Sequence, residues 1–305
     1  MSAGARERRR TGDETRLAWA LVAPALGVVL LVAVFPLAWT VWESLHLHDL
    51  RMPRLGRPFV GLDNYVELAR DGRFWRSLAH TAVFAAVTVA LELVLGLLLA
   101  LAMDRAWRGR GLVRAAVLVP WAIPTVVAGL LWRFAFDADA GLVNALLRDA
   151  GLVHAGPVWL AGPLTAWVPI VLADVWKTTP FVALLLLAGL QNVDPALHEA
   201  AAMDGAGPAR RLWHVTLPLL RPAILVALVF RTLDAFRVFD LVYVLTGGGP
   251  GTSTEPVALY TQSTLLQNLR FGYGSAMSVA VFVATFGLAM LYVRWLGRDA
   301  ATEER

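Results

Sequence analysis

The sequence predicts an all-α integral membrane protein with six transmembrane helices. Of its 305 residues, 58% are hydrophobic and only 16% are charged, whereas about a quarter of the residues of soluble domains are charged. The mean hydropathy is +0.60, and several apolar runs reach the roughly 20 residues that a helix needs to cross a bilayer core. Backbone polar groups cannot stay unpaired in lipid, so each run is expected to be a helix. An ordinary soluble enzyme is excluded.

The predicted spans form one domain over 17–296, between a basic tail, 1–16, and a short C-terminal tail, 297–305. The first span follows arginines as a signal peptide does, but it is too long for a signal peptide's apolar region and lacks a convincing cleavage site, so we expect it to be retained. The six spans are expected at about 17–42, 77–103, 112–136, 164–190, 222–245 and 276–296.

Arginine placement predicts that both tails are cytoplasmic. Positively charged residues favour the cytoplasmic ends of spans, and an even number of spans puts both termini on one side. The first outer loop is an exception, because it also contains several arginines. The arginines assigned to the cytoplasmic side lie in 6–16, 105–110, 210–221 and 298–305.

The loop 191–221 is too long to be a simple connection between two spans. Asp194 can cap a helix that begins with proline and continues through an alanine-rich run. That helix should end at Gly205, and a second short helix should start at Pro208 and end before Pro218. We therefore expect two short helices, joined by a glycine elbow, that project from the membrane into the cytoplasm.

The segment 199–206, EAAAMDGA, followed by Leu217 and Pro218, resembles the EAA loop of ABC importer permeases. Leu212 stands where that family usually has phenylalanine, so a hydrophobic side chain is kept but its shape differs. Further segments resemble the carbohydrate branch, especially permeases for maltose or trehalose. These are GLDNY at 61–65, WKTTPF at 176–181, FRVFD at 236–240 and TGGGP at 246–250.

The resemblance implies a MetI-like, maltose-type permease fold with a cytoplasmic coupling helix. The chain would form half of the path of a sugar, for example trehalose or maltose, in a bacterial or archaeal inner membrane. The implied partners are a second homologous permease, two copies of a cytoplasmic ABC ATPase and an extracytoplasmic sugar-binding protein. The residues implied to couple to the ATPase are Glu199, Ala200, Asp204, Gly205 and Ala206.

The sequence contains no phosphate-binding motif of its own. The glycine-rich segment 247–251 has no lysine after it, so it does not match a P-loop. We expect no catalytic residues and no cofactor in this chain, with ATP used by the partner ATPase. No metal site is expected either, because His46 and His48 lack further ligands nearby and cysteine is absent. No basic stripe with interleaved aromatics indicates nucleic-acid binding.

Two predicted spans carry polar residues near the middle of the bilayer. Arg231 and Asp234 lie in the fifth span, and Trp176 and Lys177 lie in the fourth. Intramembrane charges are functional or paired by default, and an aromatic ring beside hydrogen-bonding groups suits a sugar. These four residues are the candidate substrate pathway.

A structural interpretation of the same charges stays open. Arg231 with Asp234, and Arg237 with Asp240, could form a ladder of i,i+3 pairs that only holds the helices together. Glu92 in the second span is best explained as the partner of a neighbouring charge.

The main alternative is an ion-coupled secondary transporter of small polar solutes, with Asp234 and Glu92 as its ion sites. Such transporters pair broken helices in two matching halves, and the sequence shows no such pair. The amphipathic cytoplasmic loop also favours the importer. An intramembrane hydrolase is less consistent still, because no G-x-S-x-G motif is present.

Overall fold

The computed structural model describes residues 18–104, 109–154 and 156–300, leaving aside the side chains of 110 and 295–300. The predicted tail 1–16 lies outside the described residues. Within the described ranges, all regular structure is helical, and the only β contacts are two isolated bridges. The all-α membrane fold is confirmed. The helices form two compact units, which we describe separately.

The first unit combines residues up to Arg70 with Thr264–Ala280. Its N-terminal helix, Ala18–Ser44, contains a π turn, η1 (Leu30–Val34), before α2 (Phe35–Ser44). Asn64 is buried and donates to the carbonyls of Ser44 and His46, which ties the loop after α2 to α3. The remaining elements are η2 (Pro53–Leu55), α3 (Asp63–Arg70), η5 (Ser263–Gln267) and the start of α14 (Phe271–Ala300).

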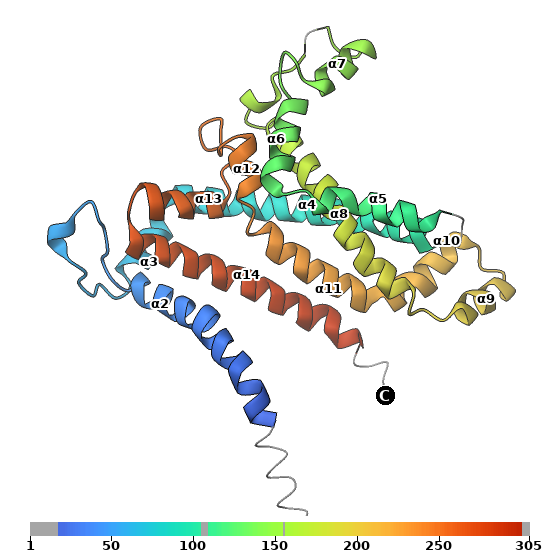
Figure 1. Ribbon diagram of the computed structural model, residues 1–305, viewed down its shortest axis with the longest axis horizontal. Coiled ribbons are helices and arrows are strands. Elements are labelled where there is room, and N and C mark those ends of the chain that lie inside the picture. Colours follow the sequence, from blue (N-terminus) through green and yellow to red (C-terminus); the bar gives the residue numbers. More distant parts are fainter. Residues whose placement is uncertain (1–17, 105–108, 155, 301–305) are drawn as a thin grey trace, which may run out of the picture. The chain divides into compact units, whose positions relative to one another are not determined.

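The second unit spans Asp71–Ser263 and the part of α14 after Ala280. Its long helices are coloured cyan, yellow-green and orange in Figure 1. In chain order its elements are α4 (Gly72–Asp104), α5 (Arg110–Ala122), α6 (Thr125–Ala135), α7 (Leu142–Asp149), η3 (Trp159–Ala161), α8 (Trp167–Leu190), α9 (Pro195–Met203), α10 (Pro208–Arg211), η4 (Leu212–Thr216), α11 (Leu217–Ala235), α12 (Asp240–Leu245) and α13 (Val257–Gln262).

Helices α4 and α8 run side by side in the same direction. Trp167, the first residue of α8, has its ring 6.0 Å from that of Phe84, which lies 12 residues into α4. Near the last residues of the two helices, Leu101 and Leu190 line a common cavity. Gly96 permits the close approach between them, because a Cβ there would lie 2.7 Å from a methyl of Val182. The second and fourth spans are separated by one span that crosses in the return direction, so they are expected to be parallel.

Helix α11 packs against α4 and α8 and runs the opposite way. Its buried Leu220 belongs to a core cluster with Met103 and Leu186, near the ends of α4 and α8 from which the chain continues to α9. We call this the α9 end of the second unit. A second cluster, at the opposite end, joins Phe84, Ile170 and Leu241.

The third predicted span is broken rather than continuous. Helices α5 and α6 meet at a bend of 90°. Ile123 is extended, with ψ 131°, and Pro124 follows it as the N-cap of α6. A proline disfavours the α conformation in the preceding residue and provides no N–H of its own. The prediction of one helix over 112–136 was wrong because hydropathy does not respond to this break.

The fifth span also differs from the prediction. The helix from Pro208 continues without a stop to Ala235, so no second short helix ends before Pro218. A π turn, η4, ends two residues before Pro218. Such a turn already disturbs the i→i−4 hydrogen bonds of the helix, so the N–H that proline lacks costs little stability there. The predicted C-terminal part of the span, up to residue 245, is a separate helix, α12.

The described residues contain five helices that are long and apolar enough to cross a membrane, or six if the bent pair α5 and α6 is one span. The predicted first, second, fourth and sixth spans correspond to Ala18–Ser44, α4, α8 and α14. The third predicted span is a bent pair of helices, and the fifth is divided between α11 and α12.

Candidate functional site

Three carboxylates surround one guanidinium inside the second unit. Arg231 Nε donates to Glu92 Oε2 at 2.5 Å, and Nη2 donates to Glu92 Oε1 at 2.8 Å. Nη2 also donates to Asp174 Oδ2 at 3.2 Å, and Nη1 donates to Asp234 Oδ2. The Thr178 hydroxyl lies 2.6 Å from Glu92 Oε1. We call Glu92, Asp174, Arg231 and Asp234 the charged cluster.

The cluster draws one carboxylate from α4, one from α8 and one from α11. Glu92 lies 12 residues before the end of α4, which is about 18 Å at 1.5 Å per residue. This depth agrees with the sequence-based placement of Arg231 near the midplane. A guanidinium presents five N–H donors in a fixed fork, so it can satisfy several carboxylates at once.

The members of the cluster differ sharply in exposure. Glu92 is 0% exposed and Arg231 is 2% exposed, whereas the side chain of Asp234 is 65% exposed. Glu92 therefore neutralises the buried guanidinium of Arg231, whereas the carboxylate of Asp234 is accessible to solvent. Within the charged cluster, the buried pair of Glu92 and Arg231 thus joins two helices, and Asp234 supplies an accessible carboxylate.

Asp234 lines two cavities. The larger, about 480 Å³, brings Lys177, Asp234 and Arg237 together with three aromatic rings, those of Trp121, Phe181 and Phe230. The rings of Trp121 and Phe181 stack at 5.9 Å. The smaller cavity, about 130 Å³, is lined by residues of the break between α11 and α12 together with Asp174 and Lys177. Apolar rings with a few convergent polar groups are typical of small-molecule sites.

The structure brings together three of the four predicted pathway residues. Lys177, Arg231 and Asp234 line the larger cavity. Trp176 does not line either of these cavities; its ring packs edge-on against Trp132 at 5.9 Å. On α8, Trp176 therefore contacts α6 through Trp132, whereas Lys177 lines both cavities.

The proposed ladder of ion pairs is present only in part. Arg231 and Asp234 are paired, but no ion pair joins Arg237 and Asp240, both of which are described. The expectation that Glu92 partners a neighbouring charge is confirmed by its contact with Arg231.

Sequence reasoning missed Asp174 and Thr178. Both lie on α8, four residues apart, and Asp174 is three residues before Lys177. A carboxylate at that spacing from the chain's single lysine within an apolar run was an available signal.

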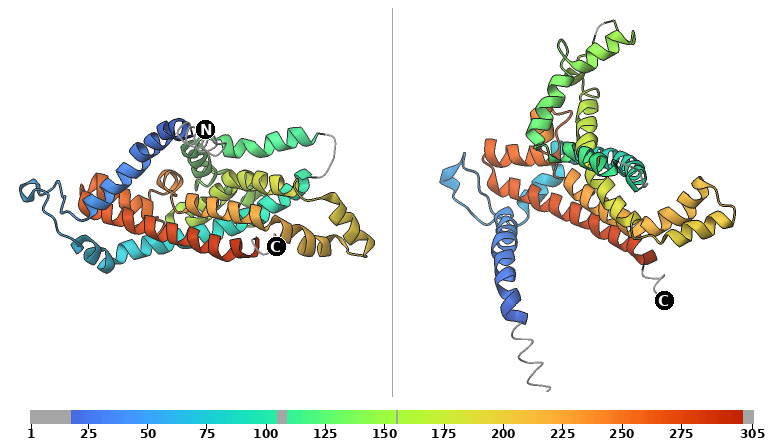
Figure 2. Two further views of the ribbon diagram at one scale, coloured as in Figure 1. Left: turned by 90° about the horizontal axis from the view of Figure 1, so that it is seen from below. Right: turned by 45° about the vertical axis from the view of Figure 1, so that its right-hand side comes forward.

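The predicted elbow has the expected local structure (Figure 2, yellow segment). Asp194 caps α9 by accepting from the amide of Ala196 at 2.9 Å. The helix ends with Gly205 at φ 78°, in the left-handed region that favours glycine. The amide of Ala206 donates to the carbonyl of Ala201 at 2.9 Å, which closes the C-terminal turn.

The predicted coupling residues lie at the surface. Glu199, Ala200, Asp204 and Gly205 are exposed, and Ala206 is half-buried. None of the residues of α9 is buried. Met203 is 88% exposed beside them, and sequence reasoning did not single it out. A short helix that shows both charged and large apolar side chains to solvent has the composition of an interface.

Comparison with known proteins agrees with this architecture. Residues 92–300 match the family described as "Binding-protein-dependent transport system inner membrane component". The chain is 44% identical to the trehalose/maltose transport system permease protein MalF of Thermococcus litoralis, over 92% of this chain and 94% of that protein. It is also 44% identical to the trehalose transport system permease protein SugA of Mycobacterium tuberculosis, over 95% and 93% of the two chains.

A solved structure has the same fold. A chain of the bacterial alginate ABC transporter, crystallised in complex with an alginate-bound periplasmic protein, superposes with a TM-score of 0.80 at 22% identity. The match covers 95% of this chain and 97% of that chain. On these grounds the chain is a multi-pass membrane protein that belongs to the family of inner membrane components of binding-protein-dependent transport systems.

Proposed function

We propose that this chain is the permease subunit of an ATP-driven sugar importer, and that α9 with its glycine elbow couples it to a separate ATPase. The single observation that carries the proposal is the surface position of α9, none of whose residues is buried, with Glu199, Asp204 and Gly205 exposed. Met203 of the same helix is 88% exposed. A cleft in a partner that receives α9 would cover it.

The proposed substrate is a disaccharide such as trehalose or maltose. Relatives that are 44% identical over more than nine-tenths of this chain are named for transport of these sugars. The residues that line the larger cavity have the chemistry that such a ligand needs. Aromatic faces pack against sugar rings, and charged groups form hydrogen bonds with sugar hydroxyls. In this proposal Lys177, Arg231 and Asp234 lie on the pathway, and Trp176 supports the fourth span from the side.

The proposed complex contains a second homologous permease, two copies of a cytoplasmic ATPase and an extracytoplasmic sugar-binding protein. The ATPase is assigned to another subunit because the chain has no G-x-x-x-x-G-K-[ST] sequence. ATP is then the partner's substrate, and this chain uses no cofactor. Both termini and α9 are cytoplasmic in this arrangement, and the segment that contains Gly249 is extracytoplasmic.

Uptake and copurification together test the proposal. A strain that lacks this chain is complemented with the tagged protein and supplied with labelled trehalose, maltose and a monosaccharide such as glucose. We expect restored, ATP-dependent uptake of a disaccharide, and recovery of an ATPase and a second permease with the tag. Uptake driven by an ion gradient, with no ATPase recovered, would instead support the secondary transporter.

A further inference from the structure

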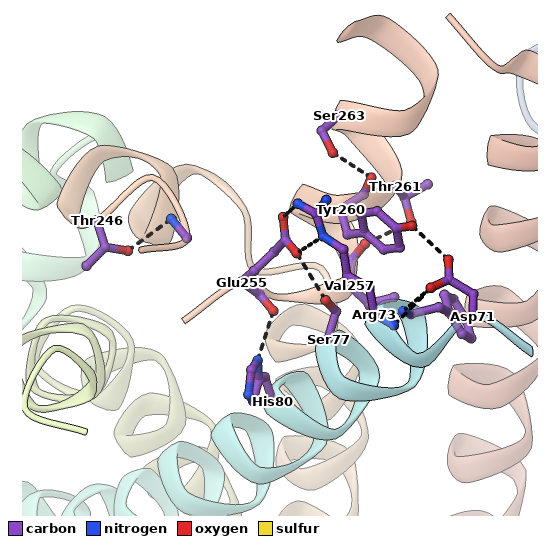
Figure 3. A network of polar contacts seen from close by, with 12 residues as sticks. Asp71, Arg73, Ser77, His80, Thr246, Glu255, Val257, Tyr260, Thr261 and Ser263 are labelled. Atoms are coloured by element: carbon purple, nitrogen blue, oxygen red, sulfur yellow. Dashed lines mark hydrogen bonds and ion pairs between the residues drawn. The ribbon is translucent and has the colours of Figure 1, made fainter. Parts of the chain in front are cut away.

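An ion pair between a partly exposed arginine and a buried carboxylate fixes the loop between α12 and α13 to the first turn of α4 (Figure 3). Arg73 Nε donates to Glu255 Oε2 at 2.8 Å, and Nη2 donates to Oε1 at 2.7 Å. Glu255 is only 5% exposed. A bidentate arginine–carboxylate pair combines charge with a fixed geometry, so it restrains the direction of the loop as well as its distance from α4.

Further hydrogen bonds hold the same carboxylate and its neighbours. Ser77 Oγ donates to Glu255 Oε2 at 3.4 Å, and His80 Nδ1 lies 3.3 Å from the backbone oxygen of Glu255. The amide of Val257 donates to Thr81 Oγ1 at 2.9 Å. Residues from three successive turns of α4 thus contact one short stretch of the loop.

Helix α8 holds the loop from another direction. Trp167 Nε1, in the first turn of α8, donates to the carbonyl of Ser253 at 3.1 Å. Within the loop, the hydroxyl of the buried Thr254 donates to the carbonyl of Gly249 at 2.7 Å, and its amide donates to the carbonyl of Gly248. The loop is therefore internally braced and cannot absorb a displacement of one end.

An aromatic ring completes the attachment of Arg73. Its guanidinium carbon lies 4.5 Å from the centre of the Tyr260 ring, and the Tyr260 hydroxyl donates to Asp71 Oδ2 at 2.7 Å. The guanidinium of Arg73 therefore contacts the carboxylate of Glu255 and the aromatic face of Tyr260.

The other end of the braced loop is α12, which forms a wall of the smaller cavity. Asp240 and Leu241 of α12, with the preceding Arg237 to Phe239, line that cavity opposite Asp174 and Lys177. Val244 packs closely on α6, since a Cβ at Gly129 would lie 3.0 Å from its methyl. Any movement that widens the cavity by shifting α12 must therefore move the braced loop and strain its contacts with α4.

We propose that Arg73 and Glu255 form a clamp that holds α12 against the first turns of α4 and keeps the smaller cavity in its narrow form, which we call closed, until sugar is delivered. The inference rests on the proposed function, which identifies the transported molecule as a sugar. Neither residue lines either cavity of the pathway, so both are positioning residues. Delivery of sugar to the loop between α12 and α13 separates Arg73 from Glu255. When the ion pair forms again, it closes the pathway behind the sugar.

A single reporter cysteine can measure the closed state, because the chain has no cysteine. Val238 lines the smaller cavity within the break between α11 and α12. In Val238→Cys, reconstituted with its partners, the rate of reaction with a small thiol reagent reports how often the cavity is open. Each clamp variant is built on this background and also measured without the reporter for ATP hydrolysis and uptake of labelled trehalose.

We expect Arg73→Gln and Glu255→Gln each to raise the labelling rate about tenfold, the shift in a closed–open equilibrium that loss of a charge-assisted pair produces. ATP hydrolysis without binding protein should rise, and uptake per ATP should fall. The exchanged pair Arg73→Glu with Glu255→Arg should restore part of the closed state. Arg76→Gln, which removes an exposed arginine from the same helix, should change neither measurement.

Unchanged labelling and unchanged basal hydrolysis in assembled Glu255→Gln complexes would overturn the clamp. If that variant does not assemble, Arg73→Lys decides, because it keeps the charge and loses the bidentate geometry; labelling equal to that of the parent protein would overturn the proposal. Failure of the wild-type complex to transport any disaccharide would refute the proposed function instead. The labelling result would still report on the clamp.

Discussion

Arg231 of α11 and Glu92 of α4 are 139 positions apart in the sequence, and their side chains meet through two hydrogen bonds of 2.5 and 2.8 Å. Both are almost fully buried. Asp234, on the accessible side of the same guanidinium, is mostly exposed. This difference in exposure separates a structural role, for Glu92, from a role in the substrate pathway, for Asp234. Substitution of the two carboxylates should therefore have different consequences.

Glu92→Gln should lower the stability of the assembled protein. Leaving a buried charge without its partner costs about 3 to 5 kcal/mol, and the other two carboxylates of the cluster reduce that cost only in part. The measurements are the yield of assembled complex and its thermal unfolding in detergent. A Glu92→Gln complex that assembles and unfolds as the parent does would show that this pair does not hold α4 to α11.

Asp234→Asn should leave assembly intact and lower sugar uptake by about tenfold or more. The exposed carboxylate contributes little to stability because solvent screens it, but losing one charged hydrogen-bond partner of a sugar costs about 1.5 to 3 kcal/mol. Uptake and complex yield are measured on the same membranes, with Glu92→Gln as the comparison. Normal uptake together with normal assembly would remove Asp234 from the pathway.

Gly205→Val should uncouple ATP hydrolysis from transport without affecting membrane insertion. At φ 78° the valine is strained by about 1 to 3 kcal/mol, so the elbow changes shape. Glu199→Lys should weaken ATPase binding by reversing an exposed charge. Gly207→Ala is the matched control, because Gly207 has φ −67° and open space around its Cβ position. Full transport by Gly205→Val, with normal substrate-stimulated hydrolysis, would mean that α9 does not couple.

Single cysteines should report the proposed orientation. Gly205→Cys should react with an impermeant thiol reagent only after the cells are opened, whereas Leu55→Cys and Thr252→Cys should react in intact cells. Leu55 is exposed, so a cysteine at that position is accessible to the reagent. Labelling of Gly205→Cys in intact cells would reverse the assigned topology.

Tyr260 should titrate above the ordinary pKa of a tyrosine. Its pKa is raised to about 12, chiefly by burial and then by its hydrogen bond to Asp71. Because the folded value lies above the ordinary value of 10, this phenol contributes stability that is complete below pH 10 and is lost as the pH rises toward 12. Absorbance near 295 nm should show a step there that Tyr260→Phe removes. A titration that is the same without Tyr260 would contradict this environment.

The sequence by itself determined the features that depend on neighbouring residues. Apolar runs long enough for a bilayer made α4, α8 and α14 helices, because lipid offers the backbone no other partners. Asp194 and Gly205 bounded α9 through contacts with residues only a few positions away. The resemblance carried by 199–206 likewise led to the family that the comparisons confirm.

Tertiary structure alone decided where helices break and which charges meet. The apolar runs at 112–136 and 222–245 satisfy the lipid whether straight or bent, so hydropathy could not locate the break before Pro124 or the end of α11 at Ala235. Burial of Glu92 and exposure of Asp234 follow from packing across three helices. The pairing of Arg73 with Glu255 spans 182 positions, and no local pattern constrains a contact at that range because its geometry is set only when α4, α8 and α12 have packed.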